Sequence, residues 1–230
     1  MTGPQRRRFA VASSTAAATP AKRVTRRRTE TRNRLLTAAY EVFAEEGFGR
    51  STVERVCDRA GFTRGAFYSN FTSLDELFLT MWEQRSAAML AGVRATLDKF
   101  AVDGVTDLRA AIERLDRAVP IDEAWYRITA EFTTHALRTP ALRQVMAARE
   151  ELIVAALMPT IVAALARVGR TVPDPVALGQ ALVAVHDGTT VQVLMEPRSR
   201  RIRRRRTELL CHVVLAYSTT TPELSTATEG

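Results

Sequence analysis

The stretch STVERVCDRAGFTRGAFYSNFTSLDEL, from Ser51 to Leu77, decides the fold of this chain. Its first part has the apolar spacing i, i+3, i+4 and i+7 that buries one stripe of a helix. The residues of that stripe are Val53, Val56, Cys57 and Ala60. Gly61 follows at the position where a helix ends in the left-handed conformation that glycine tolerates. The stretch therefore predicts two short helices, a tight turn between them, and the start of a longer helix.

Capping residues mark the three predicted helix starts. Ser51 and Glu54 have the spacing of a capping box, and Ser73 and Glu76 repeat it. Thr63 is placed to cap the second short helix. In that second helix Ala66, Phe67 and Phe71 are expected to point inward, and Arg64, Gly65, Tyr68 and Ser69 to face outward. Two short helices joined by a turn that contains glycine form a helix-turn-helix, whose second helix can lie in the major groove of DNA.

The run from Ala60 to Phe71, followed by Ser73 and Leu77, resembles the signature of the TetR family of transcriptional repressors. The match extends from Arg32 to Phe78 and includes Ala38, Phe43, Gly47, Phe48 and Val53. The resemblance implies an all-α fold, with an N-terminal helix-turn-helix DNA-binding domain and a C-terminal helical ligand-binding and dimerisation domain. At Leu74 the chain departs from the family, which usually has a lysine there that contacts a DNA phosphate.

The net charge of +8 has one source. Residues 1–28 contain eight basic residues and no acid, so the rest of the chain is neutral overall. This segment has few large apolar side chains and is expected to be a disordered, Arg-rich arm that contacts DNA phosphates or a minor groove; the alternative is a solvated tail. Seven further arginines lie between Arg198 and Arg206. They favour a solvated helix start or loop over a site for an acidic partner or nucleic acid.

Beyond the arm, the pattern predicts a helix-turn-helix domain at 29–72, a helical domain at 73–218 and a flexible tail at 219–230. The expected helices of the second domain are about 73–100, 105–118, 122–138, 140–168, 175–195 and 202–218. Prolines supply most of their boundaries, because proline is tolerated at a helix start but not inside a helix. Pro159 is the exception and predicts a kink or a split in the 140–168 helix. No convincing strand is present.

Several classes of function are disfavoured by what the sequence lacks. Cys57 and Cys211 are far apart, so neither a disulfide framework nor a metal site is indicated. The histidines at 135, 186 and 212 are scattered, and no nucleophile motif or phosphate-binding glycine loop occurs. No run approaches the ~20 apolar residues of a membrane helix. We therefore expect a cytoplasmic protein with no cofactor, no metal and no enzymatic activity.

The candidate DNA contacts lie on the arm and on the two short helices. Hydroxyls and helix-start amides can donate to phosphate oxygens, and the forked guanidinium of Arg64 suits either phosphate or guanine. The candidates are Arg26, Arg27, Arg28, Ser51, Thr52, Thr63, Arg64, Gly65, Tyr68 and Ser69. Tyr68 could instead be a packing residue and Ser51 only a cap.

Two further sites are expected in the helical domain. Side chains that could line an effector pocket are Trp125, Tyr126, Phe132, Met146, Met158 and His186, although such residues are more often core. The resemblance places a homodimer interface on the last two helices. Its candidates are Leu182, Thr189, Val193, Leu210, Val213, Val214 and Tyr217, with the intramolecular core as the alternative.

These features predict a homodimeric repressor that binds a palindromic operator on double-stranded DNA. By the resemblance, a small effector enters the helical domain and tilts the long linking helix, which changes the distance between the two DNA-reading helices. The few internal charges favour a hydrophobic or amphipathic effector. The alternative is a cytosolic ligand-binding or scaffold protein on the same fold with little specific DNA binding, which Leu74 favours slightly.

Overall fold

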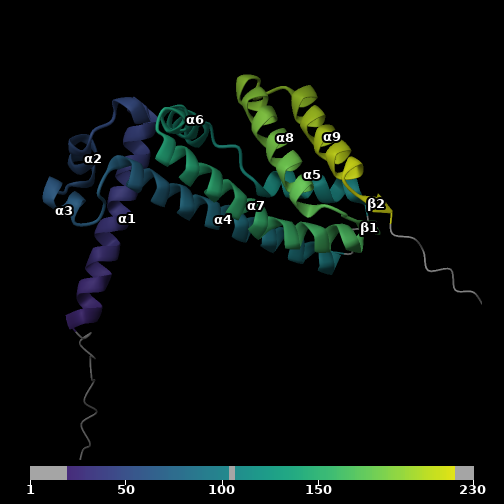
Figure 1. Ribbon diagram of the computed structural model, residues 1–230, viewed down its shortest axis with the longest axis horizontal. Coiled ribbons are helices and arrows are strands. Elements are labelled where there is room, and N and C mark those ends of the chain that lie inside the picture. The colour runs from purple at the N-terminus through teal and green to yellow at the C-terminus, as the bar shows by residue number, and fades with distance from the viewer. Residues whose placement is uncertain (1–19, 104–106, 221–230) are drawn as a thin grey trace, which may run out of the picture.

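The computed structural model describes residues 20–103 and 107–220, which form nine α-helices (Figure 1). The helices are α1 (Pro20–Glu46), α2 (Val53–Ala60), α3 (Arg64–Tyr68), α4 (Leu74–Asp103), α5 (Leu108–Ala118), α6 (Glu123–Leu137), α7 (Pro140–Arg167), α8 (Pro175–Met195) and α9 (Arg200–Ala216). A short 3-10 helix, η1 (Phe48–Arg50), follows α1. Within the described ranges, strand structure is limited to β1 (Arg170–Thr171), antiparallel to β2 (Thr219–Thr220). The predicted all-α class is confirmed.

The first helix begins at Pro20, whereas the sequence pattern began the helix-turn-helix domain at residue 29 and assigned 1–28 to a disordered arm. That boundary was wrong for residues 20–28; residues 1–19 lie outside the described part of the chain. The helix reaches further because proline is well placed at its first position and the following Ala, Lys and Arg are good helix formers. Extending an existing helix also costs much less than nucleating one. In Figure 1 the N-terminal half of α1 projects beyond α2 and α3.

The turn between α2 and α3 has the predicted geometry. Gly61 ends α2 at φ 69°, in the left-handed region, and its amide donates to the carbonyl oxygen of Asp58 at 3.2 Å. The cap of α2 is Thr52, whose Oγ1 accepts from the amide of Arg55 at 3.3 Å. The predicted capping box at Ser51 was therefore wrong. The Ser51 hydroxyl instead donates to the carbonyl oxygen of Gly47 at 2.7 Å.

The long helix α4 connects the helix-turn-helix to the rest of the molecule. Its start is capped by Ser73, whose Oγ accepts from the amide of Glu76 at 3.1 Å. The carboxylate of Glu76 accepts from the amide of Thr72 at 2.7 Å, so the predicted capping pair is present with Thr72 as the second donor. Helix α7 continues through Pro159 and is not split.

One hydrophobic cluster crosses the predicted boundary between residues 72 and 73. It joins Phe43, Phe48 and Phe67 of the first part of the chain to Phe78 on α4 and Phe132 on α6. The rings of Phe78 and Phe132 stack with centroids 3.7 Å apart, and Phe48 meets Phe132 edge to face at 4.9 Å. The helix-turn-helix and the helical domain therefore share part of their core. A second cluster fills the space between α5, α7, α8 and α9.

Candidate nucleic-acid interface and helical domain

The helix α3 is anchored through its inner face and presents its outer face to solvent. Phe67 is fully buried and Phe71 is 1% exposed. Thr63 caps the helix, with its Oγ1 accepting from the amide of Ala66 at 3.2 Å. On the other side Thr63, Arg64, Gly65, Tyr68 and Ser69 are exposed, and half of the Tyr68 side chain is accessible. Packing thus fixes α3 and leaves its predicted contact residues free to meet another molecule.

Arg64 is held by an exposed ion pair. Its Nη1 lies 2.8 Å from Oε1 of Glu54 on α2, and its guanidinium carbon lies 5.9 Å from the ring centre of Tyr68. A hydrogen bond to Tyr68 and the charge of Glu54 raise the pKa of Arg64 above its ordinary value. Exposed pairs of this kind contribute little stability, so a phosphate or a base can replace Glu54 at small cost.

Arginines of α1 bind the end of α3. Nη2 of Arg28 donates to the carbonyl oxygen of Ser69 at 3.3 Å, and Nη1 of Arg32 donates to that of Asn70 at 2.7 Å. The Arg32 guanidinium also lies over the ring of Phe71, 4.2 Å from its centre. Cations are favoured near the carbonyl end of a helix. Arg32 was not among the predicted site residues; its signal was the four-residue spacing from Arg28, which puts both on one face of α1.

Other predicted contact residues have mixed environments. Arg26, Arg27 and Arg28 are exposed and helical. Thr52 is exposed at the start of α2, whereas Ser51 is partly buried. Leu74, at the position where the resemblance leads one to expect lysine, packs against the cluster that contains Phe67 and Phe71.

The predicted effector-pocket residues are divided between two hydrophobic clusters and the polar network of Arg206. Phe132 and Met146 are buried in the cluster shared with the helix-turn-helix, and Trp125 packs against it. Met158 belongs to the second cluster. His186 contacts the buried Arg206 instead. Phe132, Met146 and Met158 are buried core residues, the alternative that the sequence left open, whereas Trp125 and His186 are only partly buried.

Two open cavities lie elsewhere. One of about 580 Å³ lies between the end of α8 and the start of α9. Its lining residues are Val191, Gln192, Met195, Glu196, Arg201, Ile202 and Arg205. The other, of about 740 Å³, lies along α1 and α2 and includes Arg26, Arg34 and Arg59. Neither cavity includes a predicted pocket residue.

Arg206 is the buried member of the arginine run and is 2% exposed. Its Nε donates to Oδ1 of Asp116 on α5 at 2.7 Å, and its Nη1 donates to Oγ1 of Thr189 on α8 at 2.6 Å. Its Nη2 lies 2.8 Å from Nδ1 of His186. Burial and the nearby Arg206 charge lower the pKa of His186 from 6.5 to about 4. His186 is therefore neutral at pH 7, and its Nδ1 accepts a hydrogen bond from Nη2 of Arg206.

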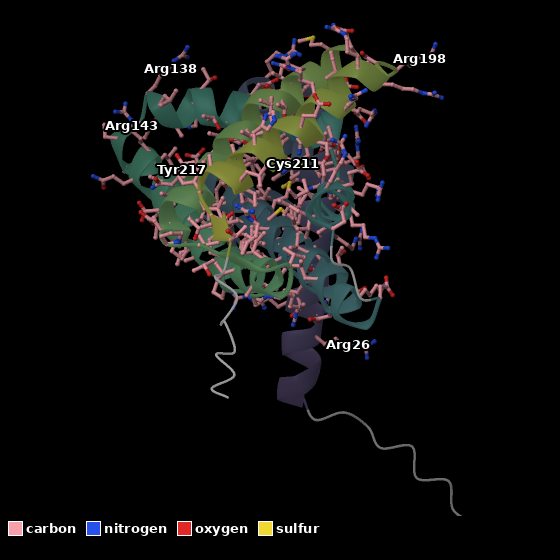
Figure 2. The ribbon with its side chains drawn as sticks, turned by 90° about the vertical axis from the view of Figure 1, so that its right-hand side faces the viewer. Arg26, Arg138, Arg143, Arg198, Cys211 and Tyr217 are labelled. Atoms are coloured by element: carbon pink, nitrogen blue, oxygen red, sulfur yellow. The ribbon has the colours of Figure 1, made fainter. Side chains whose placement is uncertain are left out.

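The network around Arg206 ties α5, α8 and α9 together through polar contacts. The other six arginines of the run are exposed, as expected for a solvated helix start. Figure 2 shows Arg198, at the beginning of this run, and Arg26 of α1 at opposite ends of the molecule. The run therefore lies away from the α1 arginines.

Most of the predicted dimer residues are buried within the chain itself. Four of them are between 3% and 9% exposed, namely Thr189, Val193, Leu210 and Val214. The sides of α8 and α9 that carry them pack against each other and against α5 and α7. Leu182 and Val213 pack against the same cluster, and Tyr217 is 40% exposed. The stripe chosen from the sequence was thus mainly intramolecular core. The outward face of the two helices carries Ala184, Gly188, Met195, His212 and Leu215, which are all exposed.

Features typical of other functions are missing from residues 20–103 and 107–220. No group of three or more His, Cys, Asp or Glu side chains in these ranges is arranged to hold a metal ion. Cys57 and Cys211 are free thiols. No helix in the same ranges is both long and apolar enough to cross a membrane.

Comparisons with known proteins agree with this geometry. Residues 35–81 match the family described as bacterial regulatory proteins, tetR family. Residues 105–217 match the C-terminal domain of BetI-type transcriptional repressors. The two matches together cover more than half of the chain and include both the helix-turn-helix and the helices from α5 to α9.

Individual relatives are similar over shorter stretches. The HTH-type transcriptional activator FasR of Mycolicibacterium smegmatis is 34% identical over 104 residues, which are 45% of this chain and 47% of FasR. The probable acrEF/envCD operon repressor of Escherichia coli K12 is 37% identical over 65 residues, 28% of this chain and 30% of the repressor. This chain thus spans about half or less of the length of these relatives.

A solved structure extends the similarity to the whole fold. The crystal structure of the multidrug binding protein EbrR complexed with imidazole superposes with a TM-score of 0.60 at 26% identity, over 86% of this chain and 97% of that one. The family and its relatives are transcriptional regulators and not enzymes. By its two family matches and its fold, this chain belongs to the TetR family of bacterial transcriptional regulators.

Proposed function

We propose that this protein is a homodimeric repressor that binds a palindromic operator and is released from it by a small molecule. TetR-family regulators bind DNA, form dimers and bind small-molecule effectors. The observation that carries the proposal is the outer face of α3, where Arg64 and Tyr68 are exposed on a helix that Phe67 and Phe71 anchor. In a two-fold dimer the two α3 helices meet half-sites about one helical turn, ~34 Å, apart.

The extension of α1 supplies a second set of DNA contacts in this proposal. Arg26, Arg27 and Arg28 are exposed on the helical segment that projects beyond α3 in Figure 1. Arg28 also donates a hydrogen bond to the residue that follows α3, which links the extension directly to the recognition helix. Arginines at this place can neutralise phosphates next to the groove that α3 enters.

The dimer forms through the outward faces of α8 and α9, not through the stripe chosen from the sequence. Ala184 and Gly188 are small enough to let a partner helix approach closely. Met195 and Leu215 are 77% and 46% exposed, which is a large apolar exposure for a helix pair without a partner. A second copy that presents the same face would cover them by an isologous contact.

The effector is a small hydrophobic or amphipathic molecule that binds in the helical domain. The EbrR structure, that of a multidrug binding protein with imidazole, supports a ligand-binding role for this fold. The side chains of Trp125 and Phe132 belong to or touch the cluster that includes Phe48 of the DNA-binding part. A ligand that separates these residues would therefore disturb the contact between the two parts of the molecule.

The proposal is tested by selecting genomic fragments that the purified protein retains, and then by competition gel shift with the recovered sequence. The expected result is one palindromic site that binds at least ~10³-fold more tightly than random duplex at the same salt concentration. If random DNA competes equally well at low salt, the operator proposal is wrong. The protein is then better explained as a ligand-binding or scaffold protein on this fold, in line with the apolar environment of Leu74.

Whether this protein represses or activates transcription needs its own experiment, because FasR is described as an activator and the Escherichia coli relative as a repressor. A reporter gene downstream of the recovered site is expected to be expressed more strongly when this protein is absent. Lower expression in its absence would assign activation.

A further inference from the structure

Asp122 lies where three helices meet. It caps α6, with Oδ1 accepting a hydrogen bond of 3.1 Å from the amide of Trp125. Its Oδ2 accepts from the hydroxyl of Tyr40 on α1 at 3.1 Å. The same oxygen lies 2.5 Å from Nη2 of Arg85 on α4. A single carboxylate thus connects the first helix of the DNA-binding part with two helices of the helical domain.

Arg85 completes this group through contacts with two rings. Its guanidinium carbon lies 5.0 Å from the ring centre of Tyr40 and 4.6 Å from that of Trp125. Both distances are within the range of a cation–π interaction. The Asp122 and Arg85 side chains are only 31% and 36% exposed, so their attraction is less screened than that of a fully exposed pair. We refer to Tyr40, Arg85, Asp122 and Trp125 as the three-helix node.

The charged state of Asp122 is maintained by its partners. Burial works against ionisation, but hydrogen bonds from the Trp125 amide, Tyr40 and Arg85 together hold the pKa of Asp122 below its ordinary value. Burial and the adjacent carboxylate raise the pKa of Tyr40. At neutral pH the hydroxyl of Tyr40 is therefore a donor and Asp122 is an ionised acceptor, which is the strong form of this hydrogen bond.

The node differs from the other polar contacts between the two parts of the chain, such as the single hydrogen bond of 3.1 Å from Arg32 on α1 to Thr80 on α4. Two more such contacts involve backbone atoms. Nη2 of Arg127 donates to the carbonyl oxygen of Ala44 at 3.3 Å, and Glu131 accepts from the amide of Gly49 at 3.4 Å. Each of these is a single contact with backbone. The contacts of Phe48 with the neighbouring rings are apolar and involve no hydrogen bond between charged groups. The node instead has directional hydrogen bonds from two elements to one carboxylate, which fix both distance and orientation.

The other capping aspartates show what a cap alone requires. Asp107 accepts from the amide of Ala110 at 2.8 Å, and Asp174 accepts from that of Ala177 at 3.0 Å. Asp174 caps α8 at a place that is far from the helix-turn-helix both in sequence and in the fold (Figure 1). Capping therefore accounts for Oδ1 of Asp122, but it does not account for the bonds that Oδ2 makes with α1 and α4.

We infer that Asp122 is a positioning residue for DNA binding, which fixes the angle at which α1 leaves the helical domain. This inference rests on the proposed function. Since Arg28 and Arg32 of α1 bind the end of α3, a rotation of α1 at Tyr40 changes the orientation of the recognition helix. A displacement of α4 or α6 by a ligand acts on the same three bonds, so the node links the state of the helical domain to DNA affinity.

The test replaces Asp122 by a residue that keeps the cap. Asp122→Asn retains an N-cap side chain, because asparagine caps about as well as aspartate, but it removes the charge that Arg85 and Tyr40 use. The matched control is Asp174→Asn, which makes the same change at a cap that lies outside the node. Tyr40→Phe removes one hydroxyl and leaves every cap intact.

Operator affinity is measured by fluorescence anisotropy with the site recovered by the wild-type protein. We expect Asp122→Asn and Tyr40→Phe each to raise Kd about tenfold, which corresponds to ~1.4 kcal/mol. The Asp174→Asn variant is expected to bind within about twofold of wild type. For the double variant Tyr40→Phe with Asp122→Asn, the increase in Kd should be smaller than the product of the two single increases, because both changes remove the same hydrogen bond. Equal Kd values for wild type, Asp122→Asn and Tyr40→Phe would overturn the inference.

Hydrogen exchange provides a readout that needs no DNA. In Asp122→Asn the amides of α1 around Tyr40 should exchange faster than in wild type, and in Asp174→Asn they should not. If these amides exchange at the wild-type rate in Asp122→Asn, the positioning role of Asp122 is wrong, whether or not an operator is found. A wild-type protein that selects no operator, but whose α1 is loosened by Asp122→Asn, would refute the proposed function and retain the mechanical role of Asp122.

Discussion

Arg32 of α1 donates a hydrogen bond of 2.7 Å to the carbonyl oxygen of Asn70, two residues after the recognition helix ends. Its other terminal nitrogen donates to the hydroxyl of Thr80 on α4 at 3.1 Å. One guanidinium thus holds the end of α3 against both neighbouring helices.

Replacing Arg32 with methionine is expected to loosen α3 and to raise the operator Kd about tenfold, the effect of losing one or two charge-assisted hydrogen bonds. Since the guanidinium of Arg32 is engaged by protein groups, the dependence of log Kd on log salt concentration should keep the wild-type slope. A salt titration by anisotropy measures both quantities. A smaller slope in the variant would mean that Arg32 contacts a phosphate instead.

The arginines at positions 26, 27 and 28 should behave in the opposite way. Changing all three to glutamine is expected to reduce the salt slope by about 0.9 for each phosphate contact that is lost. The control changes Arg198, Arg200 and Arg201 to glutamine, which removes equal charge at the end of the molecule opposite to Arg26 (Figure 2). That control should keep the wild-type slope; equal slopes in all three proteins would show that the α1 arginines do not touch DNA.

The outer face of α3 can be tested without disturbing the fold. Tyr68→Ala and Arg64→Ala remove side chains that are exposed, so the free energy of unfolding should change by less than about 1 kcal/mol. Operator binding should nevertheless weaken at least about tenfold. Anisotropy and light scattering together check that affinity falls while the dimer persists. A large loss of thermal stability would assign these two side chains to the core.

The buried His186 predicts a pH dependence of stability. Its pKa falls from 6.5 in the unfolded chain to about 4 in the folded protein, because it is buried beside Arg206 and only Asp116 opposes that effect. As the pH falls, His186 is therefore protonated at a higher pH in the unfolded chain than in the folded protein. Desolvation raises the pKa of the adjacent Asp187, which acts in the opposite direction because the folded protein favours the protonated form of that carboxyl.

The contribution of His186 to stability is consequently complete above pH 6.5 and is lost progressively as the pH falls from 6.5 toward about 4. Urea unfolding between pH 8 and 4 should show this loss. A His186→Asn variant, which keeps an acceptor for Arg206, should show a smaller loss over the same interval. If both proteins follow the same curve, His186 does not titrate in the folded protein as described.

Helix positions were largely predictable because apolar periodicity and proline boundaries are local signals. Helix α8 occupies 175–195 in both the prediction and the structure. The end of α2 at Gly61 and the cap of α3 at Thr63 were also correct. The start of α1 was missed because the arginines before Thr29 were interpreted as a solvated arm, although arginine is a good helix former.

The contacts between distant segments could not be predicted in the same way. The stripe with Thr189 and Val193 shows that one face of α8 is buried, but periodicity does not say whether the same chain or a partner covers it. The role of Arg206 depends on Asp116, which lies 90 residues earlier. The same limitation applies to Asp122, whose spacing to Trp125 indicates a cap and carries no information about Tyr40.

The unbroken course of α1 from Pro20 to Glu46 makes it a lever. Tyr40 and Arg28 are separated by about 18 Å along the axis, at ~1.5 Å per residue. A rotation of only about 5° at Tyr40 would therefore displace Arg28 by ~1.6 Å, comparable to the sub-ångström to few-ångström shifts that packed helices undergo in switching. The displacement of Arg28 thus depends on the length of the helix, and a glycine in place of the exposed Asn33, between these two residues, is expected to weaken their coupling.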